Sequence, residues 1–207
     1  MKKDYRLFYL LSCFLLSCPL YAQSNWVRCS EGLPAGKTVM ALTHIGPTLF
    51  AATQKGGVYK STDNGSSWQA TPSHNSLSQT STSSLAAMDT FIFAAQVGHG
   101  ILRSSLHDTL WSLLDSGLSN KHVQDILAVG STLYTATYGG GVFFSTNLGN
   151  SWSVLNGNAG MEDLRVFSLA ANSTTLFAGT AGTNSIPDTG VAYRTTFGGP
   201  RFLSVSP

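Results

Sequence analysis

One acidic residue, Asp63, stands in a setting that could support chemistry. It lies in the stretch KSTDNGSSW, residues 60–68, between Ser61 and Gly65, and Trp68 closes the stretch. A carboxylate held in a tight turn beside a hydroxyl could act as a catalytic acid or base. The same residues could instead cap a turn between two strands, because Asp and Ser side chains bond readily to turn backbone. The surrounding sequence decides between these two interpretations.

The stretch is one copy of a repeat. The four tryptophans, Trp26, Trp68, Trp111 and Trp152, are 42, 43 and 41 residues apart, and Phe202 follows as a fifth member. A hydroxyl stands seven residues before each of the last four aromatic residues, at Ser61, Ser104, Ser145 and Thr195. Two short apolar segments, such as VMALTHIG and TLFAAT, precede each hydroxyl. Features that keep one phase over the whole chain indicate a structural repeat of about 40 to 45 residues.

Each repeat predicts four short strands, here named A to D. Their segments are rich in β-branched and aromatic residues and are bounded by Gly, Asn, Asp or Pro, and no sustained helical spacing occurs. In the first repeat the strands are expected at Val39–Ile45, Leu49–Thr53, Gly57–Ser61 and Ser67–Ala70. A four-stranded antiparallel unit of this length is typical of a β-propeller blade, so the predicted fold class is all-β. Blades are expected at about 39–72, 82–116, 123–157 and 166–206.

One segment has no repeat of its own. Residues 25–30, NWVRCS, resemble a D strand without A, B and C strands, and we expect an orphan strand there. With four full blades already present, the orphan favours a part of a larger propeller of six to eight blades, whose remaining strands lie beyond Pro207. Such a part on its own would form an open arc, or a strained ring, with exposed edges and apolar faces.

The repeat resembles a known family. STDNGSSW matches Ser-x-Asp-x-Gly-x-x-Trp, the Asp-box or bacterial neuraminidase (BNR) repeat, at all four defining positions. GGVYKSTDNGSSW and GGVFFSTNLGNSW are similar to the tandem repeats of exported bacterial propellers. Sialidases, the sortilin lumenal domain and some endoglucanases carry the same box, so the resemblance implies a fold and not a reaction. The structural box residues expected here are Ser61, Asp63, Gly65, Trp68, Ser104, Trp111, Ser145, Asn147, Gly149 and Trp152.

The degenerate boxes favour turn capping over catalysis. Asn147 replaces the acid in the third box, and Leu106 and Phe197 stand there in the second and fourth. The Arg-Ile-Pro motif of sialidases is absent, and no pair of carboxylates stands out as a glycosidase would require. The histidines lack metal-ligand spacing. We therefore assign no catalytic residue, metal or cofactor. A glycan-active hydrolase, sialidase-like or endoglucanase-like, with its catalytic residues outside this chain is the alternative.

The N-terminal segment predicts export. Basic residues precede the apolar run 7–20, and PLYAQS offers cleavage after Ala22. The run is too short for a spanning helix, so residues 1–22 are interpreted as a signal peptide, and the protein is expected to be secreted or in the cell envelope. LLSC, ending at Cys18, offers lipoprotein anchoring as the less favoured alternative, because Pro19 follows directly.

Charge and cysteine content restrict the expected partners. The net charge is +2 and 11% of residues are charged, without a basic patch that interleaves aromatics, so nucleic acid is not an expected partner. Cys29 is the only cysteine left after cleavage, which excludes a disulfide framework, and we expect it to be a buried small hydrophobe. A protein or a glycan remains as the expected partner, and no membrane span is predicted.

The repeat also predicts where a ligand would bind. In a propeller the B–C and D–A loops share one rim, opposite the box turns. The fourth B–C loop, within AGTNSIPDTG, is seven residues longer than the others, which breaks the symmetry of that rim. The candidate ligand residues are His99, Tyr138, Asn184 and Asp188. Tolerated loop variation is the alternative explanation of the insertion. The expected role is non-catalytic binding or scaffolding, with assembly of a larger complex as a further possibility.

Overall fold

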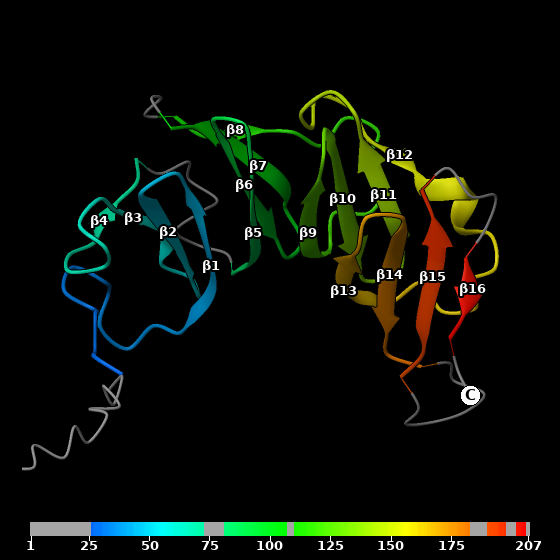
Figure 1. Ribbon diagram of the computed structural model, residues 1–207, viewed down its shortest axis with the longest axis horizontal. Helices are drawn as coiled ribbons and strands as arrows, with labels where there is room; N and C mark the ends of the chain where they lie inside the picture. Colours follow the sequence, from blue (N-terminus) through cyan, green and yellow to red (C-terminus); the bar gives the residue numbers. More distant parts are fainter. Residues whose placement is uncertain (1–25, 73–80, 107–109, 183–189, 198–201, 206–207) are drawn as a thin grey trace, which may run out of the picture.

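The chain folds into four small antiparallel sheets that follow one another in sequence order. The computed structural model describes residues 26–72, 81–106, 110–182, 190–197 and 202–205. Within them, each sheet has four strands, and every strand pairs with the next along the chain. Figure 1 shows the sheets side by side in an arch, with β1 to β4 at one end and β13 to β16 at the other. This is the expected all-β propeller architecture, and we call the sheets the first to fourth blades.

The strands fall at the positions that the repeat predicts. In the first blade, the predicted A and C strands have the observed bounds, the B strand begins one residue earlier, and the D strand is reduced to two residues. The first blade is β1 (Val39–Ile45), β2 (Thr48–Thr53), β3 (Gly57–Ser61) and β4 (Gln69–Ala70), and the second is β5 (Thr82–Met88), β6 (Phe91–Gln96), β7 (Gly100–Ser105) and β8 (Ser112–Leu113). The third is β9 (Val123–Val129), β10 (Thr132–Thr137), β11 (Gly141–Ser145) and β12 (Ser153–Val154), and the fourth is β13 (Val166–Ala171), β14 (Thr175–Thr180), β15 (Ala192–Thr196) and β16 (Leu203–Ser204).

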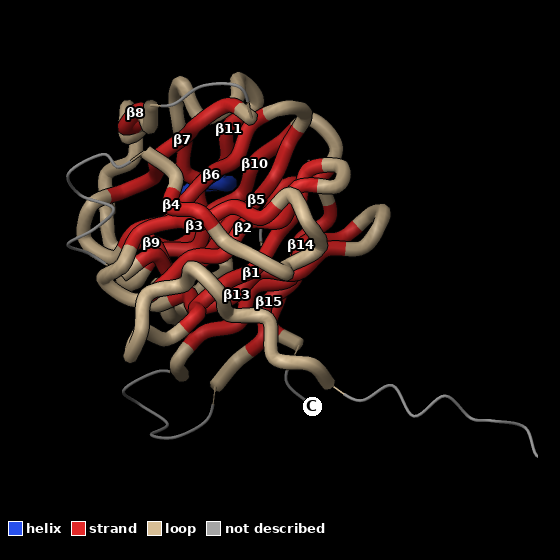
Figure 2. Tube along the Cα trace, turned by 90° about the vertical axis from the view of Figure 1, so that its left-hand side faces the viewer, coloured by secondary structure: helices blue, strands red, loops and turns tan. Residues whose placement is uncertain are grey.

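Helix is nearly absent from the described residues. One short 3-10 helix, η1 (Leu155–Asn158), follows β12 and is the single blue segment in Figure 2. No helix in the described part of the chain is long and apolar enough to cross a membrane.

The predicted orphan strand at 25–30 does not form. Residues 26–30 are described and have no strand conformation. The physical reason is the lack of a partner edge, because a D strand pairs with the C strand of its own blade and all four C strands already pair with β4, β8, β12 or β16.

A threonine at the end of the B strand stabilises three of the four B–C turns. The hydroxyl groups of Thr53 and Thr137 donate to the carbonyl oxygens of Gly57 and Gly141, at 3.0 and 2.9 Å. Thr180 donates similarly to Val191 across the longer fourth loop, at 3.1 Å. These bonds satisfy buried backbone carbonyls at the point where the chain reverses. They fix the start of the C strand in these three blades, and therefore the loops that precede it on this rim.

The cores lie between blades rather than within them. Three clusters of buried side chains join the first blade to the second, the second to the third, and the third to the fourth. Phe50, Phe93 and Tyr134 occupy one position of the repeat, and each packs toward the following blade. A blade is a single sheet with two apolar faces, so the neighbouring blades must cover both of them.

The two ends of the arch show what happens without a neighbour. Leu85, Ile126 and Leu169 occupy one repeat position and are 8%, 3% and 9% exposed, because a preceding blade covers each of them. Leu42 occupies the same position in the first blade and is 66% exposed. At the far end, Ala192 in the fourth blade is exposed, whereas its counterpart in the third blade, Val142, is fully buried. At both ends of the arch, repeat positions that a neighbouring blade buries elsewhere are therefore exposed to solvent.

We predict a large loss of stability for one apolar truncation and almost none for another. Phe93→Ala removes a fully buried ring between the second and third blades and should lower the free energy of unfolding by about 3 to 5 kcal/mol. Leu42→Ala, at an exposed position, should change it by less than about 0.5 kcal/mol. Urea unfolding followed by circular dichroism measures both. Similar losses for the two variants would show that the cores do not lie between the blades.

Candidate functional site

The first box forms a closed turn around Asp63. The Ser61 hydroxyl donates to Asp63 Oδ1 at 2.7 Å, and the Gly65 amide donates to Ser61 Oγ at 2.9 Å. The amide and hydroxyl of Ser67 donate to the two carboxylate oxygens, at 2.9 and 2.6 Å. Asn64 and Gly65 both have positive φ, 57° and 85°, which lets the backbone turn tightly enough for these bonds. Both carboxylate oxygens of Asp63 are thus used within the turn.

The third box repeats this turn with an amide in place of the acid. Ser145 donates to Asn147 Oδ1 at 2.8 Å, and the Ser151 amide donates to the same oxygen at 3.0 Å. Asn147 Nδ2 donates to the Ser151 hydroxyl at 2.8 Å, and the Gly149 amide donates to Ser145 Oγ at 2.9 Å. The turn therefore needs a side-chain acceptor at this position and does not need a charge.

Without that acceptor the box hydroxyl bonds elsewhere. The Ser104 hydroxyl in the second box and the Thr195 hydroxyl in the fourth donate to the carbonyl of the next residue, each at 3.3 Å. The box hydroxyl thus bonds to the side chain of Asp or Asn where the box contains one, and to a backbone carbonyl where it does not. The apolar position of the box persists in all four blades, where Trp68, Trp111, Trp152 and Phe202 are all buried.

Each box tryptophan is fastened to the preceding unit of the repeat. The indole Nε1 of Trp68 donates to the Cys29 carbonyl at 3.2 Å, and that of Trp152 donates to the Leu114 carbonyl at 3.1 Å. Trp111 donates to the Thr71 hydroxyl at 3.2 Å. All three acceptors stand three residues after the previous tryptophan of the repeat. The box tryptophan is thus a hydrogen-bonded contact between consecutive units as well as a buried ring.

A glycine permits the same contact in the backbone. Gly32, Gly117 and Gly160 all have positive φ. A Cβ on them would lie only 2.0 to 2.1 Å from the carbonyl oxygen of Trp68, Trp152 and Phe202 respectively. Only glycine allows this approach. The Gly-Leu pairs at Gly32 and Gly117 therefore mark the point where one repeat unit touches the next.

Arg103 adds a further contact between blades. Its Nη1 donates to the Leu148 carbonyl in the third box turn at 2.7 Å and reaches Asn150 Oδ1 at 3.3 Å. Its guanidinium also lies 4.8 Å from the centroid of the Phe91 ring. The Arg103 side chain therefore spans from the second blade to the third.

The charge of Asp63 fits a capping role. Hydrogen bonds from the Ser67 hydroxyl and amide, and then from Ser61, lower the pKa of Asp63 from its usual 3.8 to about 2. The group is therefore a carboxylate throughout the neutral range and holds no proton that it could give to a leaving group.

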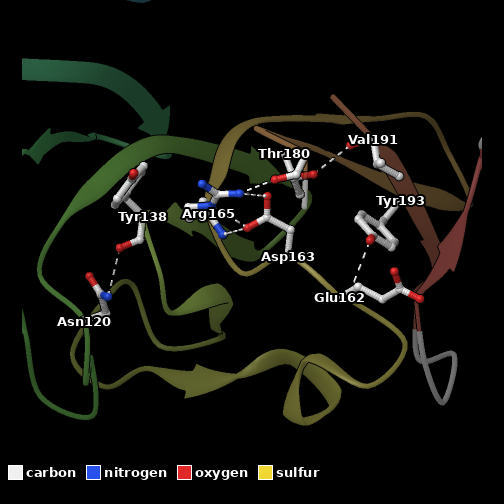
Figure 3. Close-up of polar contacts among 9 residues, drawn as sticks. Asn120, Tyr138, Glu162, Asp163, Arg165, Thr180, Val191 and Tyr193 are labelled. Carbon is white, nitrogen blue, oxygen red and sulfur yellow. Dashed lines mark hydrogen bonds and ion pairs between the residues drawn. The ribbon is translucent and has the colours of Figure 1, made fainter. Parts of the chain in front are cut away.

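The opposite rim gathers a different set of side chains between the third and fourth blades. Tyr138 follows β10 and forms an isolated bridge with Arg165, which precedes β13. Arg165 Nε donates to Asp163 Oδ1 at 2.9 Å, and its Nη2 donates to Asp163 Oδ2 at 3.0 Å and to the Gly182 carbonyl. Figure 3 shows the Asp163 carboxylate and the Arg165 guanidinium pointing toward each other, with dashed lines between them. The cluster of Tyr138, Asp163, Arg165 and Phe167 is called the rim cluster below.

The rim cluster combines a rigid polar base with exposed rings. Burial would raise the pKa of Asp163, but the hydrogen bonds from Arg165 outweigh burial and lower it. Tyr138 and Phe167 meet edge to face, with centroids 5.6 Å apart and planes at 80°, and they are 43% and 46% exposed. The backbone of Tyr138 is held by bonds to His122 and Asn120. Two aromatic rings are thus presented to solvent on a fixed frame.

The predicted ligand residues are only partly placed. Tyr138 lies in the rim cluster. His99 is exposed in the B–C turn of the second blade, with its Nδ1 3.4 Å from the Val97 carbonyl, and no hydrogen bond or ring contact joins it to Tyr138. Asn184 and Asp188 lie outside the described residues. Sequence reasoning missed Arg165 and Phe167, although the position of Arg165 directly before an A strand, on the same rim, could have indicated it.

Cys29 differs from the expected buried hydrophobe. It is an exposed free thiol. It lines a hollow of about 460 Å³ with its neighbours in the chain and with Asn64 and Ser66 of the first box turn. In the described part of the chain, no three His, Cys, Asp or Glu side chains gather as a metal site would need.

Solved structures of β-propeller proteins share this fold. The extracellular domain of the hybrid two-component system protein BT3049 from B. thetaiotaomicron has a TM-score of 0.65 and 15% identity over 88% of this chain and 26% of its own. YCF48 from Cyanidioschyzon merolae has a TM-score of 0.63 and 14% sequence identity, over 84% of this chain and 58% of its own. A GH74 enzyme from Niastella koreensis has a TM-score of 0.62 and 17% sequence identity, over 83% of this chain and 30% of its own.

These similarities show the fold alone, because every identity is low. The chain spans less than two thirds of the length of each of these three proteins. A second structure of YCF48, bound to D1 peptide, has a TM-score of 0.65 and 15% identity over 84% of this chain and 56% of its own. No protein-family model matches the sequence, and no curated protein matches it significantly.

We predict that Asp63 acts on stability through hydrogen bonds. Asp63→Ala should lower the melting temperature at pH 7, whereas Asp63→Asn should nearly preserve it, because Asn147 makes the same bonds in the third blade. The lowered pKa of Asp63 adds a pH dependence. Its stabilisation is complete above the usual pKa of 3.8 and is lost as the pH falls toward about 2.

Thermal unfolding at pH 7 and across that acid range measures both effects. The native protein should lose stability on acidification more steeply than Asp63→Asn does. An Asp63→Ala variant with an unchanged melting temperature and a lost specific activity would contradict the capping role.

Proposed function

We propose that this chain is an exported, non-catalytic β-propeller that binds an extended segment of a partner protein on the rim between its third and fourth blades. The observation that carries the proposal is the rim cluster, where two exposed rings stand on a base held by the Asp163–Arg165 pair. Aromatic side chains in a rigid setting provide large contact areas at little cost in conformational entropy, and such residues dominate protein interfaces.

The polar part of the cluster suits recognition more than catalysis. Arg165 uses its Nε and Nη2 atoms on Asp163 and Gly182, so both side chains are committed to positioning. Asp163 is ionised and nearly buried, which leaves it without the proton of a general acid. The exposed rings of Tyr138 and Phe167 are therefore the groups free to meet a ligand.

The comparisons support binding of a protein segment. YCF48, one of the propellers that resemble this chain, is known in a structure bound to D1 peptide. An extended peptide presents alternating side chains and backbone groups, which aromatic surfaces on loops can accommodate. That likeness concerns the fold, and the role of the rim cluster in this chain is our inference.

We further propose that the boxes are structural Asp-boxes. In the first and third blades, the Ser61, Asp63, Ser145 and Asn147 side chains bond within their own turns. The box tryptophans join neighbouring units. On this assignment the chain is related to Asp-box propellers by its architecture. The residues of the box take no part in ligand binding.

Export is part of the proposal. The predicted signal peptide at 1–22 lies outside the described residues and supports it through its sequence alone. One of the similar solved structures is an extracellular domain. The protein would then act in the cell envelope or outside the cell.

A glycan-active hydrolase is the second candidate. GH74 enzymes share the fold, and exposed aromatic rings such as those of Tyr138 and Phe167 also suit the apolar faces of sugars. In that case the catalytic carboxylates would be supplied by residues outside the described part of the chain.

A peptide array separates the two candidates. The exported chain is labelled and applied to random 12-residue peptides, and the best binder is titrated by fluorescence anisotropy. Tyr138→Ala with Phe167→Ala should weaken binding by about tenfold or more and leave the melting temperature unchanged. Leu113→Ala, at an exposed position on β8, is the matched control and should bind as the native protein does.

The parallel arm tests glycans. The native protein is incubated with xyloglucan and sialylated oligosaccharides, and released sugars and retention on a glycan gel are measured. Peptide binding that survives the double substitution would contradict the rim assignment. Release of sugars would overturn the non-catalytic role.

A further inference from the structure

The turn between β13 and β14 carries a sequence motif that the repeat does not explain. Residues 172–174 read Asn-Ser-Thr. An asparagine followed two residues later by Ser or Thr is the acceptor motif for N-linked glycans, provided that the middle residue is not proline. The repeat places Asn172 at the position of Ile45, Met88 and Val129, which are apolar and pack toward the following blade. In the fourth blade this position is polar and exposed.

The Asn172 side chain turns its oxygen toward the backbone and leaves its nitrogen open. Its Oδ1 accepts from the backbone amides of Thr174 and Thr175, at 2.9 and 2.8 Å, and from the Thr174 hydroxyl at 3.3 Å. Among the described residues, no group bonds to the Asn172 Nδ2 atom. Asn172 and Thr174 are both exposed. The nitrogen that a glycan would modify is therefore accessible, and the hydroxyl of the motif lies beside the same side-chain amide.

The hairpin holds this turn on the rim of the box turns. The Asn172 amide donates to the Thr175 carbonyl at 3.0 Å, and the Phe197 amide donates to the Thr174 carbonyl at 3.1 Å. Phe197 stands at the acid position of the fourth box and directly follows β15, whose end pairs with the start of β14. The turn therefore lies on the rim opposite the rim cluster. A glycan on Asn172 would extend away from the exposed rings of that cluster.

The sequence holds a second copy of the motif in a different setting. Residues 64–66 read Asn-Gly-Ser, but the Ser66 hydroxyl donates to the Asp63 carbonyl at 2.9 Å and so is used by the box turn. Gly65, the middle residue, is buried, and its amide is bonded within the same turn. A transferase could bind this copy only by opening the closed turn. The two copies thus differ in accessibility, and the structure favours the motif at 172–174.

We propose that Asn172 is the acceptor of an N-linked glycan, which an oligosaccharyl transferase adds from a lipid-linked sugar diphosphate. Asn172 Nδ2 attacks the anomeric carbon of the sugar, and the bond from that carbon to the diphosphate oxygen breaks as the new N–C bond forms. The lipid diphosphate leaves, and one proton passes from Nδ2 to a base of the transferase. Such glycans are bulky and occupy surface turns of exported proteins. The proposal requires export and is independent of the rim cluster.

Glycan transfer to the folded chain tests this proposal. The purified chain is incubated with a purified oligosaccharyl transferase and a lipid-linked oligosaccharide, and the modified residues are mapped by mass spectrometry of its peptides. The folded chain should gain one glycan, on Asn172, and none on Asn64. A synthetic peptide of residues 60–68 should be modified at Asn64, because outside the fold no closed turn protects its motif.

Two variants at one position provide the matched control. Thr174→Val removes the hydroxyl of the motif and keeps the size of the side chain, so it should abolish transfer to Asn172 and leave the melting temperature nearly unchanged. Thr174→Ser keeps the hydroxyl and should remain an acceptor. A folded native chain without a glycan on Asn172 contradicts the proposal, as does transfer to Asn172 in Thr174→Val. Equal modification of Asn64 and Asn172 in the folded chain also contradicts it, because the box turn should exclude the transferase.

Discussion

A four-stranded blade has two apolar faces, and neither can be buried by the blade itself. Every other feature of this structure depends on that constraint. The cores are therefore interfaces, with Phe93 and its counterparts packed toward the next blade. The box tryptophans reach back to the preceding unit and Arg103 reaches forward to the next box turn, so polar contacts follow the same direction as the apolar ones. Exposure at the two ends follows directly, because a terminal blade keeps a face that was built for a neighbour.

The same constraint explains the decay of the box. In the first and third blades a side-chain acceptor closes the turn, and it can be a carboxylate or an amide. In the second and fourth the acceptor is absent, and yet the aromatic ring persists and is buried. The ring maintains the interface between blades, whereas the acceptor improves one turn. Variation is tolerated where it costs a few local hydrogen bonds, and a ring is retained where its loss would open a core.

The sequence predicted what repeats and missed what does not. The strands, the box turns and the tryptophan column could be predicted, because the same spacing recurs in four units. Residues 26–30 look like a D strand in sequence, but strand formation depends on a partner edge, which no local pattern reveals. Cys29 was expected in a core and is exposed for the same reason. Arg165 and Phe167 were not predicted, because the rim cluster joins two blades. Their contacts with Tyr138 arise from tertiary packing, which the repeat pattern does not show.

The central claim is that the box fastens one blade to the next, and native-state hydrogen exchange tests it most directly. The probes are the Gly149 amide, bonded to Ser145 Oγ, and the indole Nε1 of Trp152, bonded to the Leu114 carbonyl. If the box is part of the interface, both protons should exchange as slowly as the core amides of β10, through global unfolding. Exchange of both at the rate of an open loop, while β10 stays protected, would contradict the account.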